Sequence, residues 1–491
     1  MYLGIDCGTQ GTKVIVVDSH HKQVIGRGYA AHQLIENSDG RREQQPNWWI
    51  DALLHAFKLA IEEANISPLL IKGIGVSGQQ HGLVVLDKND TPLYNAKLWC
   101  DTETATENNA LIQALGGSDR AFEKLGILCQ TGYTASKISW LRKYHPQLYS
   151  QIAKIMLPHD YLNYWLTGIF ATEYGDASGT GYFDVINRQW DDDIFNVIAP
   201  ELDPKQVLPQ LVSSDQRLGI IKKDVAQLLG LNEQVIVATG GGDNMMGAIG
   251  TGNIQQGVVT MSLGTSGTLY TYTDTPLQNL PPMIANFCSS SGGWLPLVCV
   301  MNMTSANNTI MSLFNLDINA FNQLISQAKI GADGITILPF FNGERVPDLP
   351  NAKASILGLD STNFTQENLA RAMIESASFT LCYGLNLFRQ AGVNISEIRL
   401  IGGGAKSAVW RQMIADIMNV EVVCLTEGEA AALGGAIQAM WVNNEGDLVS
   451  LCRDFVHIDD SSKTSPIQEN TAKYAPIYQR YLSCLTQYYS I

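Results

Sequence analysis

The chain contains one strand–turn–strand pattern twice. Gly8-Thr-Gln-Gly-Thr12 aligns with Gly264-Thr-Ser-Gly-Thr268 at a constant offset, and strand-like runs flank both turns. Two such hairpins, each opening one half of the chain, predict duplicated α/β domains. The alternative is two unrelated Gly/Thr hairpins, which requires a coincidence of both position and order.

A run of three glycines, at positions 240–242, follows the strand-like residues 235–237 and directly precedes Asp243. Glycine allows a tight turn at a strand end and a close approach of the backbone to a ligand. Because residues 245–249 form a helix-like run, Asp243 lies at the start of a helix. Two interpretations stay open here: Asp243 caps a core helix, as Asp often does, or it is a catalytic carboxylate facing a cleft.

A second triple-glycine segment, Gly402-Gly-Gly404, follows the strand-like residues 398–401. Side chains at these positions would prevent a flat group from lying on the backbone. The segment therefore predicts a platform for an adenine ring or its ribose. A tight strand-to-helix turn is the alternative.

The two hairpin turns present successive backbone N–H groups, which bind phosphate oxygens without a lysine. Asp6 ends the strand before the first turn. Mg²⁺ usually takes one or two carboxylates together with substrate phosphates, so we expect Asp6 to act on Mg²⁺ directly or through water. A turn-forming Asp that bonds its own backbone is the alternative.

Composition excludes some classes of function. The 491 residues, 45% of them hydrophobic, suffice for two or more globular domains, and the net charge is −15. We therefore expect neither nucleic acid nor an anionic membrane as a partner, since both require basic patches. Nine scattered cysteines without a C-x-x-C pair, and no signal peptide or membrane-spanning run, indicate a cytoplasmic protein.

Several motifs resemble those of the FGGY carbohydrate kinases, in chain order from residue 1 to about residue 440. They are Ile5-Asp-Cys-Gly-Thr9, Gly78-Gln-Gln-His-Gly82, Leu98-Trp-Cys-Asp101, Gly240-Gly-Gly-Asp-Asn244, Ser262-Leu-Gly-Thr-Ser-Gly267, Leu338-Pro-Phe-Phe-Asn-Gly-Glu-Arg345 and Ile401-Gly-Gly-Gly-Ala-Lys-Ser407. The resemblance implies an α/β fold of two actin-like ATPase (ribonuclease H-like) domains with a catalytic cleft between them. We place the sugar-binding domain at residues 1–247. The ATP-binding domain then spans residues 248–491 and ends in a terminal helix near residues 476–489.

The resemblance also implies roles for single residues. Asp243 would be the general base, Asp6 would lie near Mg²⁺ and the γ-phosphate, and both are expected metal ligands, directly or through water. The expected sugar contacts are Gln80, His81, Asp101 and Asn244. The expected ATP contacts are Thr9, Gly11, Thr12, Gly264, Thr265, Gly403, Gly404 and Ser407.

Two positions depart from the family pattern. The sugar loop commonly reads G-Q-M-H-G, whereas Gln80 replaces the methionine here, and an amide there can add a hydrogen bond to the sugar. The family often has an arginine two residues after the Asp that matches Asp101, whereas this chain has Glu103. The second departure weakens the expectation for the far end of the sugar site.

The activity that the resemblance implies is ATP-dependent, Mg²⁺-dependent phosphorylation of D-xylulose to D-xylulose 5-phosphate. Kinases of ribulose, gluconate or glycerol are alternatives within the family. An actin-like or chaperone-like ATPase is an alternative outside it, although this chain has no separate peptide-binding region after residue 440. The expected partners are a small sugar and ATP, and both a homodimer and a monomer stay open.

Overall fold

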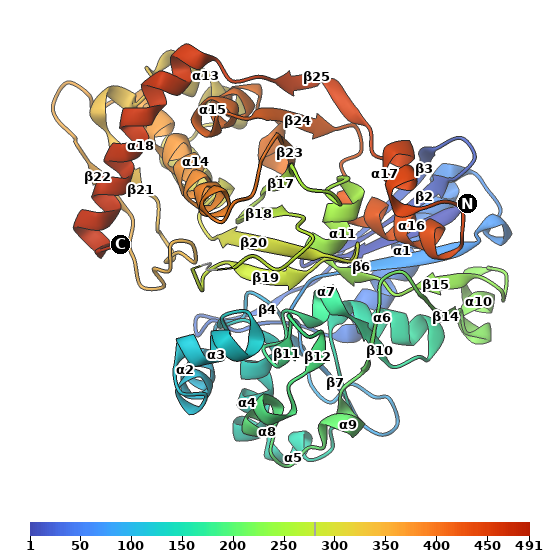
Figure 1. Cartoon of the computed structure of the whole chain (residues 1–491). Coiled ribbons are helices and arrows are strands. Elements are labelled where there is room, and N and C mark those ends of the chain that lie inside the picture. Colours follow the sequence, from blue (N-terminus) through green and yellow to red (C-terminus); the bar gives the residue numbers. More distant parts are fainter. Residues whose placement is uncertain (279–280) are drawn as a thin grey trace.

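The computed structural model describes residues 1–278 and 281–491 and contains two seven-stranded sheets, one in each half of the chain (Figure 1). The first sheet has the order β14-β15-β6-β1-β2-β3, with β16 paired to β6. Its strands are β1 (Tyr2–Cys7), β2 (Gly11–Asp18), β3 (Gln23–Ala31), β6 (Gly73–Gly78), β14 (Arg217–Ile220), β15 (Ile236–Ala238) and β16 (Gly241–Gly242).

The second sheet has the order β19-β20-β18-β17-β23-β24-β25. Its strands are β17 (Val258–Leu263), β18 (Gly267–Thr271), β19 (Ala285–Cys288), β20 (Trp294–Val300), β23 (Glu397–Ile401), β24 (Glu421–Leu425) and β25 (Ile458–Thr464). In each sheet three antiparallel strands are followed by two parallel ones: β1, β2 and β3 with β6 and β15, and β18, β17 and β20 with β23 and β24. The predicted α/β duplication is confirmed.

Helices cover both sheets. They include α1 (Pro46–Ala64), α4 (Thr134–Tyr144), α6 (Pro158–Thr167), α11 (Asp243–Gly250), α12 (Thr304–Leu313), α14 (Gln366–Gln390), α15 (Ala408–Met418), α16 (Ala430–Val442) and α18 (Gln468–Tyr489). The other α-helices are α2 (Ala105–Ala114), α3 (Ser118–Leu125), α5 (Pro146–Tyr149), α7 (Tyr174–Ala177), α8 (Asp192–Ile198), α9 (Pro204–Val207), α10 (Lys223–Leu229), α13 (Ile318–Gln327) and α17 (Leu448–Phe455). The short strands are β4 (Ile35–Glu36), β5 (Arg42–Gln44), β7 (Val84–Leu86), β8 (Ala96–Lys97), β9 (Lys154–Met156), β10 (Ala171–Glu173), β11 (Phe183–Asp184), β12 (Gln189–Trp190), β13 (Gln210–Val212), β21 (Thr336–Leu338) and β22 (Ser355–Leu357).

Helix α16 comes from the second half of the chain and packs on the first sheet. A Cβ at Gly4 of β1 would lie 1.8 Å from the carbonyl oxygen of Ala432, and a Cβ at Gly75 of β6 would lie 2.0 Å from that of Gly435. Glycines in these two strands therefore let the helix backbone reach the sheet directly. Helix α16 also crosses α11, the helix that begins at Asp243, so the two halves meet beside the site.

The terminal helix α18 is longer than predicted. It begins at Gln468 rather than near Pro476, which lies inside the helix. A proline usually marks the first turn of a helix, and this favoured the later start, but packing overrides that local signal. Tyr474, in the part of the helix before Pro476, is buried against the second half.

Among residues 1–278 and 281–491, no helix combines the length and the apolar composition that a bilayer crossing requires.

Candidate active site

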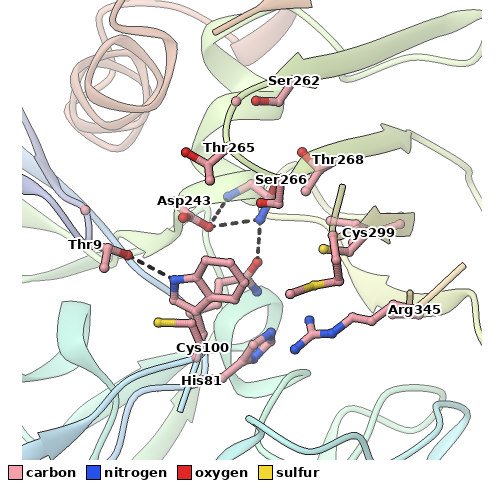
Figure 2. A pocket seen from close by; sticks show the side chains of 18 of the residues that line it. Thr9, His81, Cys100, Asp243, Ser262, Thr265, Ser266, Thr268, Cys299 and Arg345 are labelled. Atoms are coloured by element: carbon pink, nitrogen blue, oxygen red, sulfur yellow. Dashed lines mark hydrogen bonds between the residues drawn. The ribbon is translucent and has the colours of Figure 1, made fainter. Parts of the chain in front are cut away.

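One large cavity, of about 800 Å³, lies between the two halves of the molecule (Figure 2). Residues from every motif except the last, Ile401–Ser407, line it. Nine of the residues with a predicted role are among them: Asp6, Thr9, Gly11, Gln80, His81, Asp243, Asn244, Gly264 and Thr265. The two hairpin turns and the first triple-glycine segment therefore meet at one place, although they are far apart in the sequence.

Asp243 faces this cavity as the first residue of α11. The N-cap is Gly242, so the carboxylate is not the cap of the helix. Its Oδ1 accepts hydrogen bonds from the backbone N–H and the Nδ2 of Asn244, at 2.8 and 2.9 Å. Desolvation and the negative charges of Asp6 and Asp176 raise the pKa of Asp243 to about 7. A carboxylate with this pKa accepts a proton near neutral pH.

Asp6 lines the same cavity near the end of β1. Its Oδ1 accepts a hydrogen bond from Ser77 Oγ at 2.9 Å, and burial raises its pKa, whereas the charge of Lys13 lowers it. Lys13 itself is paired with Glu429 of the second half at 2.6 Å. Two carboxylates in one partly buried space repel each other, so Asp6 and Asp243 form a place where positive charge is stabilised.

The loop between β6 and β7 brings Gln80 to Asp243 through Asn244. Asn244 Nδ2 donates to Gln80 Oε1 as well as to Asp243 Oδ1, both at 2.9 Å. These bonds fix the orientation of the Gln80 amide, whose Nε2 is buried and has no hydrogen-bond partner among the described residues. A buried donor without a partner is costly, so a ligand oxygen in the cavity would satisfy it.

His81 is held as a neutral ring in an unusual backbone conformation. Its φ is +64°, which is rare for a residue with a side chain. Its carbonyl oxygen accepts hydrogen bonds from Lys137 Nζ at 2.6 Å and Thr134 Oγ1 at 3.2 Å, which stabilise that conformation. Burial and the charges of Lys137 and Arg345 lower the pKa of His81 well below its usual value. The ring packs 4.5 Å from that of Tyr133, so it serves as a neutral wall of the cavity.

Comparison with known proteins identifies the family to which this chain belongs. The N-terminal domain of the FGGY family of carbohydrate kinases matches residues 1–250, and the C-terminal domain of that family matches residues 259–442. The chain belongs to the FGGY family. The predictions of a carbohydrate kinase and of two actin-like ATPase domains are confirmed.

Similarity to individual members of the family extends over nearly the whole chain. A curated xylulose kinase of Haemophilus influenzae is 68% identical, with 100% of both chains covered, and one of Bacillus subtilis is 31% identical, with 99% of this chain and 96% of that one covered. The crystal structure of a xylulose kinase from Bifidobacterium adolescentis matches with a TM-score of 0.82 at 29% identity, covering 97% of this chain and 98% of that chain.

The turn between β17 and β18, where the sequence predicts phosphate binding, lies on the other wall of the cavity. The carbonyl oxygens of Gly264 and Thr265 accept hydrogen bonds from the hydroxyls of Thr304 and Ser305, at 2.7 and 2.9 Å. The hydroxyls at the start of α12 thus hold the turn by its carbonyl oxygens. The Thr265 and Ser266 side chains face the cavity (Figure 2).

Four residues with predicted ATP roles do not line the cavity. Gly403 and Gly404 form a short 3-10 turn after β23, and Ser407 caps α15 by accepting a hydrogen bond from Trp410 N–H at 3.3 Å. Thr12 is fully buried, and its Oγ1 lies 2.9 Å from His32 Nε2. Their contacts with ATP stay predictions.

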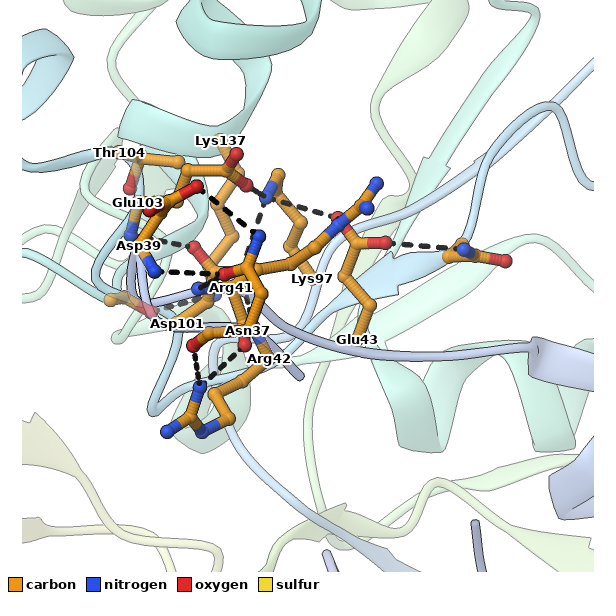
Figure 3. Close-up of polar contacts among 12 residues, drawn as sticks. Asn37, Asp39, Arg41, Arg42, Glu43, Lys97, Asp101, Glu103, Thr104 and Lys137 are labelled. Atoms are coloured by element: carbon orange, nitrogen blue, oxygen red, sulfur yellow. Dashed lines mark hydrogen bonds and ion pairs between the residues drawn. The ribbon is translucent and has the colours of Figure 1, made fainter. Parts of the chain in front are cut away.

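Asp101 is also outside the cavity lining, in a buried cluster of charges (Figure 3). Its Oδ2 accepts hydrogen bonds from Lys97 Nζ at 3.1 Å and Arg42 N–H at 2.8 Å. Glu43 and Glu103 lie 3.1 and 2.5 Å from the same ammonium. Lys97 is thus the cation that the three carboxylates share, Arg41 Nε also lies 3.1 Å from Glu43, and Glu103 pairs with Lys97 where the family often has an arginine.

Two residues of the cavity were missed in the sequence, although both lie in the motifs quoted above. Trp99 Nε1 donates to Thr9 Oγ1 at 2.9 Å, which ties the first turn to the segment after β8. Arg345 reaches across from the second half, donates to the carbonyl oxygen of Thr131 at 3.4 Å, and lies 5.9 Å from the ring of Trp99. The signal that could have identified them is their place in two of the quoted motifs, Trp99 two residues before Asp101 and Arg345 at the end of Leu338–Arg345.

Proposed function

We propose that this FGGY kinase transfers the γ-phosphoryl group of ATP to D-xylulose, giving ADP and D-xylulose 5-phosphate, with Asp243 as the general base. The observation that carries this proposal is the position of Asp243. Its carboxylate lies in the cavity between the donor-rich loop of Gln80 and the turn of Gly264. A sugar hydroxyl and a triphosphate held on these two sides would meet at the carboxylate.

Asp243 would accept the proton of the attacking hydroxyl. Its Oδ1 is occupied by Asn244, which leaves Oδ2 for the substrate. Gln80 Nε2 would donate to a neighbouring sugar oxygen, and the ring of His81 would bound the far side of the sugar. Positioning of both reactants is the larger part of catalysis in phosphoryl transfer, and here the Asn244 amide links the sugar loop to the base.

The residues present fit Mg²⁺. Asp6 and Asp243 supply hard carboxylate oxygens in one cavity, and the charge of Asp6 raises the pKa of Asp243, so a cation beside them would relieve that repulsion. We assign the metal to these two residues, directly or through water. Bound Mg²⁺ supplies neutralisation of the charge on the phosphate oxygens.

The backbone N–H groups of the Gly264 turn, with Thr265, would bind ATP phosphates. Thr9 and Gly11 of the first turn would face the γ-phosphate side, and Gly403, Gly404 and Ser407 would hold the adenosine. Thr12 is buried behind the first turn, and its contact with ATP stays a prediction. This assignment places the sugar mainly in residues 1–247 and ATP mainly in residues 248–491. The nine cysteines are all free, which supports a cytoplasmic location.

A panel of acceptors with ATP and Mg²⁺, followed through coupled ADP production, tests the proposal. D-xylulose is expected to give the highest kcat/KM, ahead of D-ribulose, gluconate and glycerol. Asp243→Asn is expected to lower kcat at least about 1,000-fold, while calorimetry still detects sugar binding. ADP production that no sugar changes would instead indicate an actin-like or chaperone-like ATPase.

A further inference from the structure

The three glycines before Asp243 lie on three buried ionisable side chains, which we call the buried bed: His159, Glu173 and Asp176. A Cβ at Gly240 would lie 3.1 Å from His159 Cδ2, and a Cβ at Gly241 would lie 3.3 Å from Glu173 Oε2. A Cβ at Gly242 would lie 3.0 Å from Asp176 Oδ1. Each residue of the bed is thus among the groups nearest to one glycine of the segment that carries the base, although Val76, Ser290 and Gln80 each provide a nearer atom.

The bed is connected within itself. His159 Nδ1 is hydrogen-bonded to Asp176 Oδ2, and on its other side His159 Nε2 lies 3.1 Å from Asp160 Oδ1. With Oδ2 held in this way, Asp176 Oδ1 faces Gly242 and has no hydrogen-bond partner among the described residues. The ring of His159 therefore fixes the carboxylate of Asp176 against the backbone.

Glu173 links the bed to the second half of the chain. Its Oε2 accepts hydrogen bonds from Gly175 N–H at 2.8 Å and from Ser290 Oγ at 2.9 Å. Ser290 follows β19 of the second sheet, and its Oγ would lie 2.8 Å from a Cβ at Gly241. The glycine segment is therefore held between groups from both halves.

The bed cannot act by touching substrate, because all three side chains are 0% exposed and none lines the cavity. Burial of ionisable groups is also costly, and well-packed apolar residues of similar size are often at least as stabilising. A general base loses much of its effect when it moves by about 1 Å. A role for these polar side chains is therefore to hold the backbone before Asp243 in one position, which apolar side chains would do less specifically.

We propose that Asp176, held by His159, is a positioning residue for Asp243, and that Glu173 ties the same segment to the second half through Ser290. The inference rests on the proposed function, since it takes Asp243 to be the base. It assigns a purpose to the triple glycine: without side chains, the backbone of residues 240–242 packs closely against these polar groups.

Asp176→Asn tests the inference, with Asp184→Asn as the matched control. Asp184 is a buried aspartate of the same half that accepts hydrogen bonds from Ile186 and Asn187 away from the cavity. Asp176→Asn is expected to lower kcat about 10- to 100-fold while both KM values change less than about threefold. The control is expected to keep kcat within about twofold of the parent.

If Asp176→Asn does not fold, a second pair of variants tests whether His159 and Asp176 position Asp243. His159→Asn retains an N–H donor near the position of Nδ1, whereas His159→Leu removes it. His159→Asn is expected to recover at least about tenfold in kcat over His159→Leu. Equal kcat values in this pair would overturn the proposal, as would a loss in Asp176→Asn confined to the KM for D-xylulose.

Failure of this inference and failure of the proposed function give different results. Turnover that survives in Asp243→Asn would remove Asp243 as the base, and the positioning role with it. An inactive Asp243→Asn beside an Asp176→Asn with the kcat of the control would overturn the positioning role alone.

Discussion

The two triple-glycine segments share a sequence but differ in their surroundings. Gly240, Gly241 and Gly242 are buried, and a Cβ at any of them would lie within 3.0 Å of another atom. Gly402 and Gly403 are exposed. A Cβ at Gly402 would lie 2.9 Å from the carbonyl oxygen of Leu263 and a Cβ at Gly404 would lie 2.5 Å from the Trp410 ring, whereas a Cβ at Gly403 would meet nothing within 4 Å. Both segments follow a strand of a duplicated sheet and lead towards a helix.

The comparison teaches that the same three-glycine sequence can be closely packed at every position in one place and leave open space at one position in another. In the first segment the missing side chains let polar groups of the protein itself press against the backbone, so that the carboxylate of Asp243 is fixed. In the second, the space beside Gly403 is open, as a platform for a nucleotide requires. Gly242 and Gly403 are a matched pair, because neither has a positive φ and alanine is compatible with both backbones.

Gly242→Ala should show the largest effect of this comparison. The added methyl group would lie 2.7 Å from Gln80 Cγ and 3.0 Å from Asp176 Oδ1, so the backbone before Asp243 must move. We expect kcat to fall about 100-fold, since a displacement of about 1 Å is costly for a catalytic group. Steady-state kinetics with D-xylulose measure it, and a kcat within twofold of the parent would break the comparison.

The pH dependence of kcat/KM should show the second effect. Burial, Asp6 and Asp176 raise the pKa of Asp243 to about 7, and a base works only when it has lost its proton. Activity should therefore fall about tenfold per pH unit as the pH drops below about 7. Gly403→Ala should leave this profile unchanged. A profile that is flat down to pH 5 would contradict the environment assigned to Asp243.

Gln80→Met should show a smaller effect, on the sugar side of the first segment. The change removes the acceptor for Asn244 and the donor Nε2, while Asn244 keeps its bond to Asp243. A lost hydrogen bond costs about 1 kcal/mol, or about fivefold, so we expect kcat/KM for D-xylulose to fall by that order and the preference among pentuloses to shift. Unchanged selectivity across the acceptor panel would refute a sugar contact through Nε2.

Gly403→Ala should show the smallest effect. With open space around the position, the free energy of unfolding should change by less than about 0.5 kcal/mol. If adenosine lies on this segment, the KM for ATP should rise about fivefold, since one misplaced methyl group costs on the order of 1 kcal/mol. Thermal unfolding and ATP titrations measure the two quantities. An unchanged KM for ATP would argue against a nucleotide platform at Gly403.

The sequence predicted the parts of the site that depend on local signals. Both G-T-x-G-T turns join antiparallel strands, as the alternation of turn residues and β-branched runs indicated. Asp6 and Asp243 were found because each lies at a strand end beside a glycine turn, and both reach the cavity. The end of α18 was predicted correctly, whereas its start was not, because Pro476 is accommodated inside the helix.

Side-chain partners far apart in the sequence were not predictable in this way. The sugar contact of Asp101 stays a prediction, but the sequence did not indicate that the backbone of the distant Arg42, together with the nearby Lys97, would hold it in a buried charge cluster. Thr12 resembles Thr268 in the repeat, yet it is buried with His32. Nothing in the local pattern of either residue distinguishes a ligand contact from an internal hydrogen bond.

The sequence by itself determined the duplicated strands, the two glycine-rich strand ends and the carboxylates that follow them, since these rest on backbone preferences of a few neighbouring residues. Only the tertiary structure decided which glycines are packed and which are open. That choice depends on side chains such as His159 and Asp176, which come from other elements and reach the segment only when the chain is folded.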